Sequence, residues 1–171
     1  VVVIGGGHAG AEAAAASARL GCETLLLTPD LARIGQMSCN PAIGGLAKGQ
    51  LVREIDVLGG EMGMAIDETG IQFRLLNTKK GPAVRSPRAQ ADKHRYQERM
   101  VAAVHDQTGL DVVAGDTAGL EIDDAGGDRR RIGGVLLADG RTLSARRVVL
   151  CTGTFMKGLM HVGENRTTGG R

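Results

Sequence analysis

The fold of this 171-residue chain is decided by its first 28 residues, VVVIGGGHAGAEAAAASARLGCETLLLT. Residues 1–4 form a short, mostly β-branched apolar run, which is typical of a buried parallel strand. Residues 9–20 are rich in alanine and predict a helix that ends at Gly21. Residues 24–27 predict a second buried strand, so the segment as a whole predicts a βαβ unit.

Three glycines lie between the first predicted strand and the helix, in the spacing G-x-G-x-x-G. In a dinucleotide-binding unit, the position of Gly5 permits the tight turn, that of Gly7 lets the backbone approach a pyrophosphate, and that of Gly10 lets helix and strand pack closely. The helix N-terminus then offers N–H donors and a positive dipole to the phosphates. The acid that usually follows the second strand is missing, and we expect the hydroxyl of Thr28 to contact the nucleotide instead, with Asp30 as the nearest carboxylate.

The rest of the chain predicts further α/β elements around this unit. We expect a Rossmann-like α/β fold, in which a parallel sheet with helices carries a small antiparallel β meander at about residues 117–146. Leu51, Ile55 and Leu58 share one face of a predicted helix and are candidates for its buried side. The expected helices span 46–58, 61–68 and 89–107, the expected strands span 71–76, 110–114 and 148–150, and 29–44 and 77–88 are expected to be loops.

Composition excludes several classes of protein. Hydrophobic residues make up 42% and charged residues 23%, as in an ordinary globular domain. Only three residues are aromatic, which excludes an RRM-type platform for stacking RNA bases. The three cysteines are far apart and the histidines have no ligand spacing, so we expect no metal site, no disulfide framework and a reducing, cytoplasmic location. No apolar run approaches the roughly 20 residues that span a membrane.

Charge is uneven along the chain, although the net charge is only +2. Residues 1–70 carry −4, residues 71–99 carry +6 and residues 100–171 are neutral. The basic segment, residues 71–99, predicts an anion-binding loop. The alternative interpretation is that these charges lie on a solvent-exposed helix face and loop without a ligand. The residues that we assign to the anion are Lys79, Lys80, Arg85 and Arg88.

Cys39 lies in a Gly/Pro-rich loop just before a predicted helix. The helix dipole and Lys48 favour a thiolate there, which makes Cys39 a candidate nucleophile. The alternative is a small buried thiol without chemistry. Cys22 and Cys151 adjoin predicted strands and are expected to be structural.

Several segments together resemble one family, that of the flavoprotein MnmG, or glucose-inhibited division protein A. The string CNPAIGG at residues 39–45 is far more specific than the glycine fingerprint. Ala47, where the family commonly has glycine, and Ser86-Pro87 depart from its pattern and affect only local loop conformation. The other matching segments are residues 5–10, 70–74, 80–85, 88–92 and 153–171.

The resemblance implies an enzyme that installs the carboxymethylaminomethyl (or aminomethyl) group at C5 of the wobble uridine of tRNA, as a homodimer working with the GTPase MnmE. The implied cofactors are FAD, NADH and a folate one-carbon donor. Thr117 is then expected near the adenine end and Thr168 near the phosphate–ribose arm. The residues expected to hold the FAD pyrophosphate are Gly5, Gly6, Gly7, His8, Ala9 and Gly10.

Residues 1–171 are expected to be the N-terminal part of the FAD-binding domain of a longer protein. The NADH-binding insertion and the C-terminal helical domain would then lie beyond Arg171. In that protein we assign Cys39 as the nucleophile or proton-transfer group, because a thiolate added at C6 of uracil makes C5 able to attack a one-carbon unit. The alternatives are a folate- and FAD-dependent tRNA uridine-54 methyltransferase and an inactive, isolated nucleotide-binding module.

Overall fold

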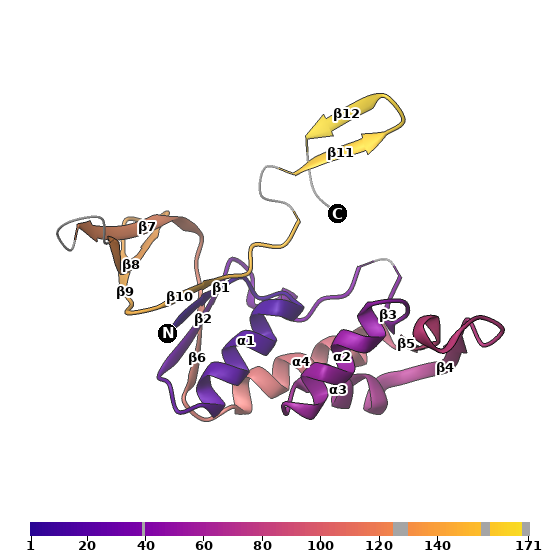
Figure 1. Ribbon diagram of the computed structural model, residues 1–171. Coiled ribbons are helices and arrows are strands. Elements are labelled where there is room, and N and C mark those ends of the chain that lie inside the picture. The colour runs from indigo at the N-terminus through magenta and orange to yellow at the C-terminus, as the bar shows by residue number, and fades with distance from the viewer. Residues whose placement is uncertain (39, 125–129, 155–157, 169–171) are drawn as a thin grey trace.

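A four-stranded parallel sheet in the order β10-β1-β2-β6 forms the centre of the molecule (Figure 1). The computed structural model describes residues 1–38, 40–124, 130–154 and 158–168. Its first three elements are the expected βαβ unit, because β1 pairs in parallel with β2 and α1 connects them. The sheet and this helix comprise β1 (Val2–Ile4), α1 (His8–Arg19), β2 (Thr24–Thr28), β6 (Leu110–Ala114) and β10 (Val148–Leu150).

Helices cover one face of the parallel sheet. Ala11, Ala14, Ala15 and Ala18 of α1 are buried, and their small side chains let this helix lie close to Val3 and Leu26. Helix α4 (Lys93–Asp106) joins the same core through Tyr96, Met100 and Val104, which are spaced by four residues and so share one face.

The antiparallel meander covers the opposite face, as Figure 1 shows. Its strands are β7 (Thr117–Asp124), β8 (Arg130–Leu137) and β9 (Thr142–Ser144), in the order β7-β8-β9. Val135 and Leu137 of β8 pack against Val2, Ile4 and Leu27 of the parallel sheet. The expected fold class, α/β with a small meander, is therefore confirmed.

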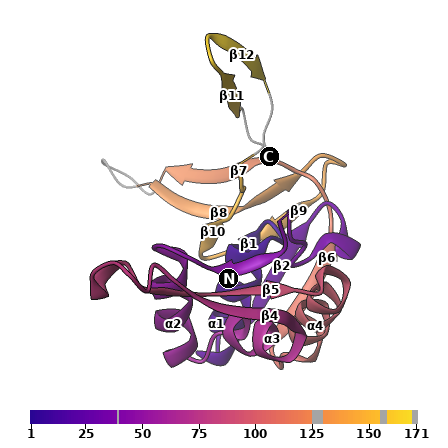
Figure 2. The same ribbon diagram turned by 90° about the vertical axis from the view of Figure 1, so that its right-hand side faces the viewer.

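A second, three-stranded antiparallel sheet lies beside the core in the order β3-β5-β4. Its strands are β3 (Ala42–Gly44), β4 (Gly70–Leu76) and β5 (Ser86–Ala91), with the 3-10 turns η1 (Leu31–Arg33) and η2 (Pro82–Val84) in the flanking loops. Helices α2 (Lys48–Val57) and α3 (Glu61–Thr69) pack against it. Figure 2 shows β4 and β5 passing above these helices.

Three element boundaries expected from the sequence are wrong, and one of them is the end of the loop expected over 77–88, because β5 already begins at Ser86. Residues 89–91 belong to β5 and not to a helix, because Ala89 pairs with Ile43 on one side and with Phe73 on the other. The helix begins only after Asp92, whose carboxylate accepts hydrogen bonds from the amides of His94 and Arg95. Likewise, the loop expected over 29–44 ends in a strand, β3.

The expectation that Leu51 and Leu58 lie on the buried side of α2 is also wrong. Leu51 is 56% exposed and Leu58 is 83% exposed, whereas Val52 is buried. The reason is the close approach of α2 to β5 at Gly49, where an added Cβ would overlap the hydroxyl of Ser86. Contact through glycine turns Val52 inward and leaves Leu51 outside.

The last described strands form a hairpin that the sequence analysis did not anticipate. Strands β11 (Leu159–Val162) and β12 (Asn165–Thr168) pair only with each other among the described residues. Both views show this hairpin projecting from the α/β body (Figures 1 and 2). Within the described ranges, no helix has the length and hydropathy required to cross a membrane.

Glu12 ties α1 to α3 inside the core. Its buried carboxylate accepts hydrogen bonds from the amides of Glu61, at 3.1 Å, and Met62, at 2.6 Å. These amides open α3, where a carboxylate is stabilised by the helix dipole. The buried charge on Glu12 is therefore compensated and fixes the angle between the two helices.

Candidate cofactor site

The loop between β1 and α1 needs two of its glycines for its own shape. Gly5 has a φ of +108°, and its amide donates to the carbonyl of Leu27 at 2.8 Å. A Cβ on Gly5 would overlap the carbonyl oxygen of Cys151, and a Cβ on Gly10 would overlap the carbonyl oxygen of Gly5. Any side chain at either position would therefore push α1 away from the strand it follows.

At Gly7, by contrast, the packing of the protein leaves room for a side chain. It is exposed, and a Cβ there would meet no described atom within 4 Å. Gly7 is also the N-cap of α1, which among the described residues has neither a capping side chain nor an acid in its first turn. The first N–H groups of α1 therefore open onto free space beside Gly7 and the exposed Ala9, an arrangement that fits a dinucleotide pyrophosphate.

The edges of this loop are built by Gly6, Thr28 and Gly35. Thr28 closes β2 and is buried against Gly6, whose added Cβ would lie 2.8 Å from the Thr28 Oγ1. The amide of Gly35 donates to the carbonyl of Gly6 at 2.9 Å. Asp30 is engaged locally, because its carboxylate accepts from the amide of Ala32 and pairs with Arg33 at 3.1 Å.

Thr117 is brought to the same edge of the sheet, and Thr168 is not. Thr28 pairs with Ala114 at the end of β6, and the amide of Gly115 donates to the Thr28 carbonyl at 3.0 Å. Thr117 begins β7 two residues later and is exposed. Thr168 ends β12, in the hairpin that extends away from this edge (Figure 1).

His8, the first residue of α1, turns its imidazole toward Tyr96 of α4. The two ring centroids are 5.7 Å apart, and Tyr96 is 0% exposed. Burial first, and the charge of Lys48 second, lower the pKa of His8 and keep it neutral. Burial and then Glu12 raise the pKa of Tyr96. His8 Nε2 and Tyr96 Oη are both buried, and neither has a hydrogen-bond partner among the described residues.

Tyr96 and Glu12 were missed by the sequence analysis. A signal for Tyr96 was present, because it precedes the core positions Met100 and Val104 at the same four-residue spacing. Nothing in the sequence marked Glu12, since its role as a helix cap depends on α3, which lies 49 residues away.

Cys39 lies outside the described residues. The loop that contains it leaves the core at Ile34, which is fully buried, and passes Gly35, which contacts Gly6 in the loop between β1 and α1 (residues 5–10, called the phosphate loop below). It then enters β3 at Ala42. Of the other two cysteines, Cys22 is exposed, and burial raises the pKa of Cys151, which makes it a poor nucleophile.

Comparison with known proteins identifies the family. A family model described as "Glucose inhibited division protein A" matches residues 1–171. The chain belongs to this family. It is 57% identical over 171 residues to the tRNA uridine 5-carboxymethylaminomethyl modification enzyme MnmG of Geobacter sulfurreducens, and 58% identical to that of Syntrophotalea carbinolica. The chain spans about a quarter of these relatives, 26% and 27% of their lengths.

Solved structures agree with this family assignment. A crystal form of Aquifex aeolicus GidA superposes with a TM-score of 0.85 at 50% identity, covering 96% of this chain and 26% of that one. The GidA-related protein of Thermus thermophilus, at 18% identity and a TM-score of 0.62, shares the fold. It is covered over 57% of its length and matches 96% of this chain.

The four basic residues assigned to an anion gather on one hairpin of this GidA-family chain, between β4 and β5. Lys79 and Lys80 lie in its tip, which the side chain of Asn77 closes by donating to the carbonyl of Val84 at 2.9 Å. Arg85 precedes β5 and Arg88 lies within it, and all four are exposed. The structure therefore places them on the second sheet, apart from the phosphate loop that follows β1.

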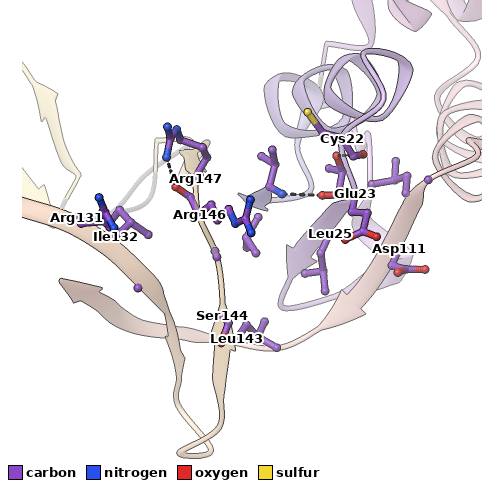
Figure 3. A pocket seen from close by; sticks show the side chains of 17 residues that line it. Cys22, Glu23, Leu25, Asp111, Arg131, Ile132, Leu143, Ser144, Arg146 and Arg147 are labelled. Atoms are coloured by element: carbon purple, nitrogen blue, oxygen red, sulfur yellow. Dashed lines mark hydrogen bonds between the residues drawn. The ribbon is translucent and has the colours of Figure 1, made fainter. Parts of the chain in front are cut away.

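A large cavity lies at the other end of the parallel strands (Figure 3). It is lined at the amino ends of β2 and β6 by Glu23 and Asp111, and on the meander side by Arg131, Arg146 and others. Among the residues that the structure describes, none of the site residues predicted from the sequence lines it. The cavity therefore lies opposite the carboxyl ends of the strands, where ligands of open α/β sheets bind.

Proposed function

We propose that the intact protein is an FAD-dependent enzyme that installs the carboxymethylaminomethyl group at C5 of the wobble uridine of tRNA. The observation that carries the proposal is the 57–58% identity, along the whole chain, to enzymes named for this modification. The GidA family model that matches all 171 residues supports it.

The assignment of FAD as the cofactor rests on the phosphate loop. Gly5 to Gly10 would hold the pyrophosphate of FAD at the start of α1, with Thr28 and Thr117 beside the nucleotide. Bound FAD supplies hydride transfer, with NADH as reductant. We assign Thr168 to the phosphate–ribose arm by family resemblance alone.

Cys39 supplies the nucleophile of the proposed reaction. Its thiolate adds to C6 of uracil, and C5, now enolate-like, attacks a one-carbon unit that derives from folate. Loss of the C5 proton expels the folate amine from this carbon, a second amine that carries the rest of the substituent adds in its place, and departure of the thiolate from C6 restores the C5–C6 double bond. Cys39 lies in the loop that starts at Gly35 beside the phosphate loop, which supports this role.

The proposed partners follow from the same family. The tRNA would dock on the basic residues Lys79, Lys80, Arg85 and Arg88, which are exposed together on one hairpin. A GTPase of the MnmE type would complete the modifying complex, and the enzyme itself would be a homodimer.

A Cys39→Ser substitution in the intact protein tests the proposal. A serine hydroxyl is a far weaker nucleophile at neutral pH, so we expect flavin content and thermal stability to be retained while wobble modification falls by at least about a hundredfold. Cys22→Ser is the matched control, because this thiol is exposed and lies at the amino end of β2. Normal wobble modification by Cys39→Ser would remove this thiol from the mechanism.

The same assay separates the alternatives. Modification of a T-loop uridine in place of the wobble uridine would identify the folate-dependent methyltransferase. Purified protein without flavin absorbance and without any modified uridine would identify an inactive nucleotide-binding module.

A further inference from the structure

The outward face of the β3-β5-β4 sheet carries a row of polar side chains. Helices α2 and α3 cover the other face, where Ile43, Ala89 and Ala91 are buried. Because side chains alternate between the faces of a strand, the neighbours of Ala89 on β5 project outward. The outward residues are Gln72 and Arg74 of β4 and Arg88 and Gln90 of β5, and all four are exposed.

The pairing of the strands sets like side chains against each other. Arg74 lies opposite Arg88, and Gln72 lies opposite Gln90. Two positive charges directly opposite on one face of a sheet destabilise it. The five ion pairs found among the described residues involve neither Arg74 nor Arg88. Among the described residues, the sheet therefore places two guanidinium groups side by side with no carboxylate at ion-pair distance from either, although Asp56 and Asp67 line the same cavity as both arginines.

A ligand that compensates this pair must be anionic, and the surrounding side chains define its chemistry. Guanidinium groups bind phosphate oxygens through paired hydrogen bonds, and the glutamine amides add further donors. Phe73 points to the helix-covered face, so the outward face has no aromatic platform for a base among the described residues. The face is therefore suited to a phosphodiester backbone and not to base recognition.

We propose that this face, formed by Gln72, Arg74, Arg88 and Gln90, is the docking surface for the phosphate backbone of the RNA substrate. Two further exposed cations, Lys79 and Lys80, lie in the tip of the adjoining hairpin. The pyrophosphate of the cofactor has its own uncapped helix terminus at Gly7 and does not need these arginines. This inference rests on the proposed function, because it assigns a place to the tRNA.

The test replaces Arg74 and Arg88 by glutamine in the intact protein and measures tRNA affinity over a series of salt concentrations. Two lost phosphate contacts should weaken binding at low salt about tenfold to a hundredfold and lower the slope of log K against log salt by about 1.4, at about 0.7 per contact. Each single substitution should lower the slope by about half as much. Flavin content should stay at the wild-type level.

The matched control is Arg53→Gln with Arg95→Gln, which removes the same charge from exposed positions on α2 and α4. An equal fall of the slope in this control would reduce the effect to general electrostatics and overturn the inference. An unchanged slope in the Arg74/Arg88 variant would also overturn it, while wobble modification by the wild type would leave the proposed function standing.

Two further outcomes distinguish failure of this inference from failure of the proposed function. Loss of flavin with an unchanged slope would assign the arginines to a phosphate of the cofactor and overturn the inference. A wild-type protein that neither binds tRNA nor modifies it would instead overturn the proposed function itself.

Discussion

Glycine has two different roles within six residues of the phosphate loop. Gly5 and Gly10 are required by the protein, because a Cβ at either would overlap backbone atoms. Gly7 is not required in this way, since its surroundings are open among the described residues. We therefore assign the absence of a side chain at Gly7 to the proposed ligand, whereas its absence at Gly10 serves the packing of α1 on β1.

This distinction predicts different outcomes for two substitutions. Gly7→Val in the intact protein should still fold but purify almost without flavin, because its side chain enters the space where the pyrophosphate would lie. Gly10→Ala should lower both flavin content and stability. Visible absorbance and thermal unfolding measure the two effects.

Gly81→Val is the control for the first variant, because a Cβ at Gly81 also meets no described atom within 4 Å and Gly81 lies in the β4–β5 hairpin. It should keep its flavin. Full flavin occupancy in Gly7→Val would contradict the assignment of this loop to the pyrophosphate.

At the scale of elements, the start of α2 contains a strained turn. Ala47 has φ +63° and ψ −52°, and the amide of Lys48 donates to the carbonyl of Leu46 at 2.8 Å. These values describe a γ-turn of the positive-φ form, which is rare and strained for a residue with a Cβ. This is the position at which the family resemblance leads us to expect glycine.

Ala47→Gly should therefore stabilise the protein. Relief of the positive φ is worth about 1–3 kcal/mol, and the added freedom of glycine in the unfolded chain offsets about 0.5–1 kcal/mol. We expect a net gain of about 1 kcal/mol in the free energy of unfolding, measured by urea denaturation of the intact protein. Ala9→Gly, at an exposed residue of α1, is the control and should destabilise instead. A lower urea midpoint for Ala47→Gly would show that the turn is unstrained.

Boundaries of elements were decided by partners far away in the sequence. Ala89, Gln90 and Ala91 favour a helix by local propensity, yet they pair with β3 and β4. The hydrogen bonds and burial gained across two strands outweigh a propensity of a few tenths of a kcal/mol per residue. Only Asp92, a typical N-cap, marks the true start of α4 in the sequence.

At the scale of the whole molecule, the half-buried His8 makes stability depend on pH. Its pKa is lowered by burial and by Lys48, so the folded protein resists protonating it. Below about pH 6.5 the unfolded chain takes up a proton that the folded His8 does not. The free energy of unfolding should therefore fall as pH decreases from about 6.5 toward the lowered pKa of His8, and this contribution should be fully present above pH 6.5.

Thermal unfolding of the intact protein at pH 7.5 and 5.5 tests this expectation. The loss of stability at pH 5.5 should be smaller in His8→Gln than in the wild type, because glutamine has no proton to gain. His105→Gln is the control, since His105 is exposed on α4, and it should keep the wild-type dependence. Equal losses in the wild type and in His8→Gln would contradict the assignment.

The sequence by itself determined the βαβ unit, the phosphate loop and the meander. These features depend on local patterns: β-branched runs, an alanine-rich helix and glycines at fixed spacing. The motif containing Cys39 also indicated the family, although Cys39 itself lies outside the described residues.

Only the tertiary structure decided which residues meet. It placed His8 against Tyr96, the carboxylate of Glu12 at the start of α3, and Arg74 opposite Arg88. The physical reason is that burial and strand pairing join segments separated by many residues, and the register between them has no local signature. The same cause turned Leu51 and Leu58 to the surface, since the contact of α2 with β5 through Gly49 outweighed the apolar pattern of the helix.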